Sequence, residues 1–298
     1  MTITFDAEIL PALQELAIQA RRDVLSKTLT GNWLSTFKGA GMEFSGYREY
    51  QPTDDAHRID WKASLRAHKL LVKELDEDKT LQVLLLVDTG DTMLYGSGKR
   101  LKAEEAMHVA STLAYPALRS GDSCGLLMYS NQVRNYAQPK IGMQQHAIIT
   151  KMLTEEEAYT GAFSLQEALR TAAGITKQRG LLIIISDFIG LQPGWDHELR
   201  AANQHFDIIG VMIRDPRDRE LPTNAGTFSL THPTTGQQIT IDTKSYAKPY
   251  REYVLKEEAD IKRRFSTAQA SLLLLELGSD VRETIMRFFA QRAAMMET

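Results

Sequence analysis

Two aspartates stand at the ends of the most apolar stretches of the chain, where their carboxylates could do chemistry. Asp88 follows the run Val83–Val87, and Asp187 follows the run 183–186. If these stretches are neighbouring strands, the two carboxylates meet at one edge of a sheet, where they either bind a hard cation such as Mg²⁺ or raise one another's pKa. The alternative is that each aspartate caps the following loop or helix by accepting backbone N–H groups. Spacing alone leaves both interpretations open.

The segments that must position these aspartates alternate between strand and helix patterns from Leu81 onward. Strands are expected at 81–87, 124–129, 133–137, 181–186, 206–213 and 272–277, and helices at 99–119, 144–153, 165–175, 196–205, 245–269 and 281–292. This alternation favours an α/β fold, a doubly wound and mainly parallel sheet with helices on both faces. Such sheets bind ligands at the carboxyl ends of their strands, near the point where the strand order reverses.

The first 80 residues follow a different pattern. A helix is expected at 6–28, and short strands are expected at 57–61 and 70–75. We therefore divide the chain into an amino-terminal helix plus small β module, residues 1–80, and a main domain, residues 81–298, with an inserted hairpin at about 215–245. The module has few apolar residues for a core of its own, so we expect it to pack on the main sheet.

The loop after the first apolar strand reads Asp88-Thr-Gly-Asp-Thr-Met and resembles the metal-ion-dependent adhesion site of von Willebrand factor A domains, Asp-x-Ser-x-Ser. Asp88 and Thr92 fit this pattern, and Asp187 matches the distal aspartate of that family. Gly90 stands at the first serine position and brings no hydroxyl group.

The threonine of the same adhesion site falls near Phe163, which has no oxygen to offer a cation. Thr160 or Ser164 could replace it only if the loop shifts. The resemblance therefore implies a degenerate metal site made of Asp88, Thr92 and Asp187. We expect no required cofactor and weak or absent Mg²⁺ binding.

The resemblance sharpens upstream, in a polar segment that mixes glycines, aromatic residues and charges. Its motifs are Gly39-x-Gly41-x-Glu43-Phe44, Arg48-Glu-Tyr50-x-Pro52-x-Asp54-Asp55, Arg58-Ile-Asp60-Trp61 and Ser64-x-Arg66. Over roughly residues 38 to 95 they closely resemble the bacterial and archaeal family called domain of unknown function fifty-eight. Thr53 departs from the pattern, because that family usually has glycine there.

This resemblance implies a von Willebrand A-like sheet in the strand order 3-2-1-4-5-6, which would place Asp88 and Asp187 side by side. It also implies a companion protein, an AAA+ ATPase of the MoxR type, and a chaperone-like or complex-maturing role. Members of the family often carry membrane helices, whereas the apolar runs of this chain are strand-sized and too short to span a bilayer.

The residue types of the motif segment allow two interpretations that do not depend on the family resemblance. It places opposite charges close together and interleaves them with Tyr47, Tyr50 and Trp61. One interpretation is an ion-pair network that locks the module against the main sheet. The other is a surface that docks a partner protein, because Arg, Tyr and Trp are the residue types that anchor interfaces.

Composition narrows the function classes. The net charge of −3 lacks the basic excess expected of a nucleic-acid binder, and one cysteine, Cys124, allows no disulfide within the chain. With no basic amino-terminal leader pattern, we expect a cytoplasmic protein without membrane insertion. Tyr95-Gly-Ser-Gly-Lys-Arg partly matches the sequence pattern of a phosphate-binding loop. It lacks the first glycine and the final serine or threonine of that pattern, so we interpret it as a turn.

Two functions from different classes remain. The first is a non-enzymatic adaptor that binds a MoxR-type AAA+ ATPase and an unknown protein client, with no catalytic residue. Its contact surface is expected at the carboxyl edge of the sheet, with Asp91 exposed at a loop tip and Thr92 and Ser164 beside it. The second is a metal-dependent hydrolase or phosphotransfer enzyme that uses Asp88 and Asp187.

Overall fold

The central feature of the computed structural model is a six-stranded sheet. The structure describes residues 5–6, 8–9, 11–13, 44–51, 54, 59–75, 80–176, 179–221, 226–231 and 237–296. The strands of the sheet are β3 (Gln82–Asp88), β4 (Ser123–Tyr129), β5 (Val133–Lys140), β6 (Gly180–Ser186), β7 (Phe206–Arg214) and β10 (Ser271–Glu276). Their order is β10-β7-β6-β3-β4-β5, and all neighbours are parallel except β4 and β5. This is the von Willebrand A-like order 3-2-1-4-5-6, so the predicted fold class is confirmed.

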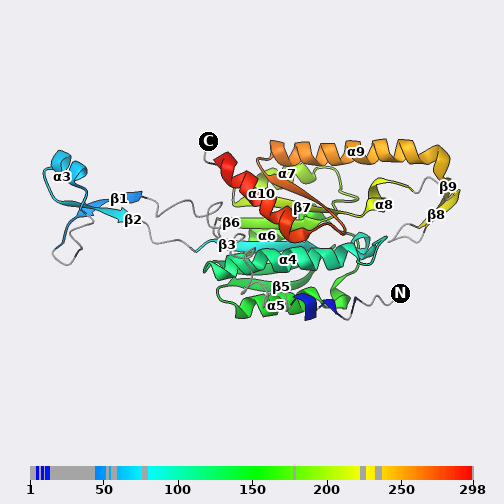
Figure 1. The fold of residues 1–298 in the computed structure, drawn as a ribbon, viewed down its shortest axis with the longest axis horizontal. Helices are drawn as coiled ribbons and strands as arrows, with labels where there is room; N and C mark the ends of the chain where they lie inside the picture. The colour runs from blue at the N-terminus through cyan, green and yellow to red at the C-terminus, as the bar shows by residue number, and fades with distance from the viewer. Residues whose placement is uncertain are drawn as a thin grey trace.

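Helices cover both faces of this sheet (Figure 1). One face packs against α4 (Lys102–Arg119), α5 (Gln144–Leu153) and α10 (Val281–Met296), and the other against α6 (Leu165–Ile175), α7 (Trp195–Ala202) and α9 (Thr243–Thr267). The central strand β3 is apolar throughout because successive side chains enter opposite cores: Val83 and Leu85 belong to the first core, and Leu84 and Leu86 to the second.

Three short helical elements lie at the carboxyl edge of the sheet, where the strand order reverses between β3 and β6. They are the 3₁₀ helices η2 (Asp91–Leu94) and η3 (Glu156–Ala158) and the one-turn helix α8 (Pro216–Arg219). A separate antiparallel pair, β8 (Thr227–Thr231) and β9 (Gln238–Asp242), lies between α8 and α9 in the chain. Among the described residues, no helix is both long and apolar enough to cross a membrane.

The amino-terminal segment belongs to the core of the main domain. Phe5, Ile9 and Leu13 are buried in the core on the α4 side of the sheet. The Phe5 N–H donates to Glu156 Oε1 at 2.9 Å, and the Phe5 ring meets Tyr159 edge to face. Apart from residues 6, 8–9 and 11–13, the segment predicted as a helix, 6–28, lies outside the described residues.

The motif segment forms a small unit of its own, which we call the motif unit: β1 (Phe44–Glu49), α3 (Trp61–Ala67) and β2 (Leu71–Leu75). β1 and β2 pair antiparallel, and Figure 1 shows the unit apart from the six-stranded sheet. The expectation that this part of the chain packs on the main sheet is therefore corrected. The segment around Phe5 supplies the packing instead, because its apolar side chains enter a core that already exists.

The predicted strand at 57–61 is wrong over the described residues 59–61, because Trp61 begins a helix, and residues 57 and 58 lie outside the described residues. Ile59 makes only an isolated bridge with Val72. Asp60 then caps α3, its carboxylate accepting the backbone N–H groups of Lys62 at 3.0 Å and Ala63 at 3.1 Å. Such a cap satisfies N–H groups that have no partner inside the helix, and it therefore fixes the start of α3.

Candidate functional site

The two strand-end aspartates lie at adjacent strands of the carboxyl edge. β3 pairs with β6 in parallel, with Val87 opposite Ile185. Asp88, the last residue of β3, and Asp187, the residue after β6, therefore lie at the ends of neighbouring strands, as the strand order implied. Neither carboxylate is exposed to solvent. Two carboxylates that are both buried must each be protonated or be compensated by a positive charge.

Asp88 is held by hydrogen bonds from both sides. Ser186 Oγ donates to Asp88 Oδ2 at 2.6 Å, and the Gly90 N–H donates to Asp88 Oδ1 at 2.7 Å. Burial, and then the negative charge of Asp187, raises the pKa of Asp88 to about 8. Asp88 therefore carries a proton through much of the neutral range, which lowers the charge of the buried pair.

Gly90 has a steric reason for its place in this loop. A Cβ atom there would lie 3.0 Å from Asp88 Oδ1 and 3.1 Å from the Phe163 backbone nitrogen. A side chain at this position would therefore require Asp88 or the neighbouring backbone to shift by a few tenths of an ångström. The glycine that brings no hydroxyl to the adhesion pattern thus allows the backbone of two loops to lie close to the buried aspartate.

Asp187 is paired with a lysine that the sequence analysis missed. Lys102 Nζ donates to Asp187 Oδ2 at 2.7 Å and to Asp218 Oδ2 at 2.9 Å. The Lys102 side chain is 1% exposed. Burial lowers the pKa of its ammonium, but the charges and hydrogen bonds of Asp187 and Asp218 outweigh burial and raise the pKa overall. The signal in the sequence was weak, because a lysine in the first turn of a helix is usually read as a solvated charge.

The backbone holds each partner of this lysine in place. Asp187 Oδ1 accepts the Ile189 N–H at 2.9 Å, and Asp218 Oδ2 accepts the Asp215 N–H at 3.0 Å. Asp215 in turn accepts the Ser97 N–H at 2.7 Å. The ends of β6 and β7, helix α8 and the loop before α4 are thereby tied together at one buried point.

The three residues predicted to face a partner have different surroundings. Thr92 lies half-exposed in η2, and Ser164 caps α6 by accepting the Glu167 N–H at 3.4 Å. Asp91 is not a free loop tip, which corrects our expectation. Its Oδ1 accepts the Gly161 N–H at 2.8 Å, and its own N–H donates to the Gly161 carbonyl at 2.8 Å. Asp91 therefore latches two loops together.

This donor set does not fit a metal-ion-dependent adhesion site. Asp187 and Asp218 already share an ammonium, Gly90 offers no oxygen at the serine position, and Phe163 is partly buried against the core on the α6 side. In the part of the chain that the structure describes, no group of three or more histidine, cysteine, aspartate or glutamate side chains is arranged to hold a metal ion.

The motif unit carries its charges on the surface. Arg48 donates to both carboxylate oxygens of Asp54 at 2.6 Å, and Lys69 pairs with Glu49 at 2.5 Å. The Lys69 and Glu49 side chains are 57% and 67% exposed. These pairs run within the unit, as does the 2.9 Å hydrogen bond from the Tyr50 N–H to the Leu70 carbonyl. Of the other predicted motif residues, Arg66 is exposed, and Glu43, Asp55 and Arg58 lie outside the described residues.

Large apolar side chains on the motif unit are exposed as well. Trp61 is 64% exposed and Leu65 is 75% exposed, and Tyr47 and Leu70 are each nearly half exposed. Trp61 and Leu65 are four residues apart on α3, so they share one face of the helix. The Tyr47 hydroxyl donates to Asp60 Oδ2 at 3.1 Å, next to Trp61. We call Tyr47, Trp61 and Leu65 the aromatic patch.

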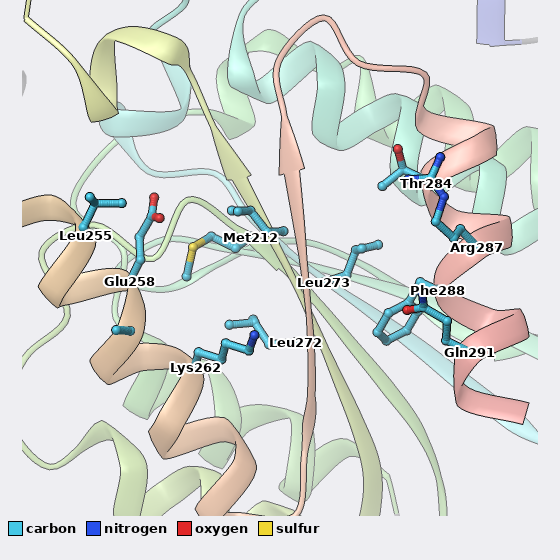
Figure 2. A pocket seen from close by; sticks show the side chains of 12 residues that line it. Met212, Leu255, Glu258, Lys262, Leu272, Leu273, Thr284, Arg287, Phe288 and Gln291 are labelled. Carbon is cyan, nitrogen blue, oxygen red and sulfur yellow. The ribbon is translucent and has the colours of Figure 1, made fainter. Parts of the chain in front are cut away.

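A groove of about 460 Å³ runs along β10, the outermost strand on the other side of the sheet. Figure 2 shows β10 between α9 and α10, with Leu272 and Leu273 pointing to opposite helices. Charged side chains of both signs line the groove, among them Glu258, Lys262 and Arg287. The groove therefore favours neither an acidic nor a basic ligand.

The buried thiol is not placed for nucleophilic chemistry. Cys124 lies in β4 with no exposed surface, and burial, followed by the charge of Asp122, raises the pKa of its thiol far above the ordinary value. A nucleophilic cysteine needs the opposite shift, toward the thiolate at neutral pH.

Comparisons with known proteins identify the same family that the motif segment resembles. A family model described as "Protein of unknown function DUF58" matches residues 46–260. The chain is 28% identical over 291 residues to "Uncharacterized protein Rv1480" of Mycobacterium tuberculosis, covering 96% of this chain and 90% of that protein. It is 29% identical over 79 residues to "Uncharacterized protein YeaD" of Bacillus subtilis, covering 26% of this chain and 18% of that protein.

Among solved structures, the chain is similar to BatB from Bacteroides thetaiotaomicron, with 16% identity and a TM-score of 0.47. The match covers 72% of this chain and 99% of that one. An aerotolerance-related membrane protein from Bacteroides fragilis matches with 13% identity and a TM-score of 0.49, over 72% of this chain and 100% of that one.

Proposed function

The chain belongs to the family described as protein of unknown function DUF58, and from that premise we propose that it is a non-enzymatic adaptor that binds other proteins. Its proposed companion is a MoxR-type AAA+ ATPase, and its proposed role is chaperone-like, in the assembly or maturation of a client protein complex. The companion follows from the family resemblance, and the binding role follows from the surface of the molecule.

The observation that carries the proposal is the aromatic patch of the motif unit. Scattered exposed apolar residues are ordinary on protein surfaces, but an exposed cluster indicates an interaction site. Trp61 and Leu65 are the two most exposed apolar side chains of the patch and lie on one face of α3. Trp and Tyr are also the residue types that contribute most to protein interfaces.

Charges around the patch indicate the kind of partner. Lys62 and Arg66 are exposed on the same short helix as Trp61 and Leu65. A complementary surface would therefore combine an apolar pocket for Trp61 with acidic residues near it. We propose that the ATPase offers such a surface.

The carboxyl edge of the sheet supplies a second proposed contact. Thr92 and Thr160 reach solvent there, on loops that the latch between Asp91 and Gly161 holds in a fixed arrangement. Loops on a rigid scaffold commonly carry binding, and a contact here would leave the motif unit free for a different protein. The client is the proposed occupant of this edge.

The competing enzyme hypothesis has weaker support. Asp88 and Asp187 are both closed off from solvent, and their oxygens are already used by Ser186, Gly90, Lys102 and Ile189. A hydrolase that used these carboxylates would need substrate to reach them. Phosphoester or nucleotide hydrolysis that requires Mg²⁺ and is lost in Asp88→Asn would favour the enzyme hypothesis over the adaptor.

The adaptor proposal is tested by affinity capture of the full-length chain from a lysate of its own host, followed by mass spectrometry. We expect a MoxR-type ATPase in the captured material, and we expect the double variant Trp61→Ala, Leu65→Ala to lose it. Tyr253→Ala is the matched control, because Tyr253 is 65% exposed but lies on α9. If the ATPase is captured equally by both variants, or is absent with the wild-type chain, the proposal is wrong.

A further inference from the structure

The Lys102 ammonium sits where three parts of the carboxyl edge converge. It comes from the first residue of α4, Asp187 from the end of β6, and Asp218 from α8. The distances to the two carboxylate oxygens are 2.7 and 2.9 Å. The ring centroid of Tyr95, from the loop before α4, lies 5.7 Å from the same nitrogen.

The charges at this point require a cation. The Asp187 side chain is 0% exposed and that of Asp218 is 12% exposed, so neither carboxylate is fully hydrated. A buried carboxylate is stable only when it is protonated or is paired with a positive group that also satisfies its hydrogen bonds. Lys102 fulfils both conditions for the two carboxylates at once, because an ammonium has three donor hydrogens.

A bound divalent cation would occupy a similar position in an adhesion site, joining carboxylates from separate elements at the carboxyl edge. Here the other expected oxygen ligands are missing at Gly90 and Phe163, whereas the distal aspartate of the pattern, Asp187, is present. The Ile189 N–H orients Asp187, and the Asp215 N–H orients Asp218, which is not part of the pattern. The site therefore lacks oxygen ligands for a metal ion, and the buried lysine supplies the positive charge instead.

We propose that Lys102 is the permanent cation of this edge, a side chain that has replaced a metal ion in joining Asp187 to Asp218. The edge is then assembled as soon as the chain folds, whatever the divalent cation concentration. Removing the ammonium while leaving its space open uncovers a latent divalent cation site formed by Asp187, Asp218 and water.

The sharpest test compares two variants that remove the same charge. Lys102→Ala leaves room for an ion with its water ligands, whereas Lys102→Met fills the space with an apolar chain of similar length. Oxygen ligands bind Ca²⁺ at about 2.3–2.6 Å and Mg²⁺ at about 2.0–2.1 Å, so only small closing movements of the two carboxylates are needed. Ca²⁺, Mn²⁺ and Mg²⁺ are each tested at millimolar concentration on the full-length chain.

We expect Lys102→Ala to melt well below the wild-type chain, and at least one of these ions to raise its melting temperature by at least about 4 °C. The wild-type chain and Lys102→Met should show no such response. Adding Asp187→Asn to Lys102→Ala should abolish the response, because one of the two carboxylates is then neutral.

Lys102→Ala could fail to fold without an ion, so refolding from urea is measured with and without each cation, and recovery only in its presence supports the proposal. The double variant Lys102→Met, Asp187→Asn removes both buried charges and should fold without any cation. The proposal is overturned if the wild-type chain binds Mg²⁺ or Mn²⁺ tightly through Asp187, if Lys102→Ala is as stable as wild type without ions, or if no cation restores it.

Discussion

Charged side chains serve different purposes in the sheet domain and in the motif unit. In the sheet domain, Lys102 and Asp187 are at most 1% exposed and hold separate elements together. In the motif unit, Arg48 is 39% exposed and Lys69 is 57% exposed, and each pairs with an acidic residue of the same unit. Removing one partner of a buried pair is strongly destabilising, because the other partner is left as an uncompensated buried charge. Exposed pairs contribute little to stability, because water solvates either partner alone.

The apolar side chains show the same contrast. Every side chain of β3 from Val83 to Val87 is fully enclosed, whereas Trp61 and Leu65 of the motif unit face solvent. The central strand of the sheet domain thus buries its apolar side chains on both faces. The motif unit retains exposed aromatic and basic residues, the combination that a docking surface needs. The following predictions test this division, beginning with the largest effect.

The largest effect is expected at the buried pair. Asp187→Ala leaves the Lys102 ammonium buried with a single partner, Asp218, and should lower the free energy of unfolding by about 3–5 kcal/mol. Urea denaturation measures the loss. Glu167→Ala is the control, because its pair with Arg170 is more than half exposed and should cost less than about 1 kcal/mol. Equal losses in the two variants would contradict the contrast.

A half-buried histidine of the sheet domain, His108, should make stability depend on pH. Burial, and then the charges of Arg100 and Arg282, lowers the pKa of His108 to about 4. The unfolded chain binds a proton to this histidine near its ordinary pKa of about 6.5, earlier than the folded chain does, so folded-state stability is complete above that pH and falls as the pH drops toward 4. Relative to His108→Asn, the wild-type chain should lose up to about 3 kcal/mol between pH 7 and pH 4.

This second prediction is measured by urea denaturation of both chains at several pH values, and the quantity compared is the difference between them. Other titrating groups change both chains alike and cancel in that difference. A difference that stays constant from pH 7 to pH 4, or that favours the wild-type chain in acid, would show that His108 is not shielded as described.

A smaller effect is expected from the surface pair of the motif unit. Arg48→Ala removes two hydrogen bonds to Asp54, but both groups can be solvated, so the loss should be about 1 kcal/mol or less. Amide hydrogen exchange of the β1–β2 pair reports it locally. A loss above about 2 kcal/mol would instead favour the ion-pair network as the purpose of the motif.

The smallest effect is expected at the aromatic patch. Trp61→Ala and Leu65→Ala should each change the free energy of unfolding by no more than about 0.5 kcal/mol, because most of each side chain is already in water. Thermal melting checks this before any binding experiment is interpreted. A fall of several degrees would mean that Trp61 packs against another part of the chain, and the patch would then no longer support a docking surface.

Local pattern predicted much of the sheet domain. The apolar runs around Leu85 and Ile184 indicated buried parallel strands, and the aspartates that follow them indicated the carboxyl edge. The strand order came from a family resemblance and agrees with the pairing observed. In the motif unit, the same reasoning misread 59–61 as part of a strand, although Asp60 followed by a run of helix-forming residues was a cap signal.

The candidate site was only half visible in the sequence. Asp88 and Asp187 could be placed together because each ends a strand, and that position follows from periodicity. The latch from Asp91 to Gly161 joins residues 70 apart, and the pair of Lys102 with Asp187 joins residues 85 apart. Neither pair has a local signature, so spacing gave no reason to expect it.

The sequence by itself determined the elements, the mainly parallel sheet and the edge at which acidic groups gather, because hydrophobic periodicity and strand ends are local properties of the chain. The tertiary structure decided what neutralises those acids and which residues remain exposed. Burial of a charge depends on every element packed around it, so only the folded chain shows that a lysine fills the centre of the carboxyl edge. For the same reason, only the folded chain shows that Trp61, an apolar residue within a motif of charges, faces solvent.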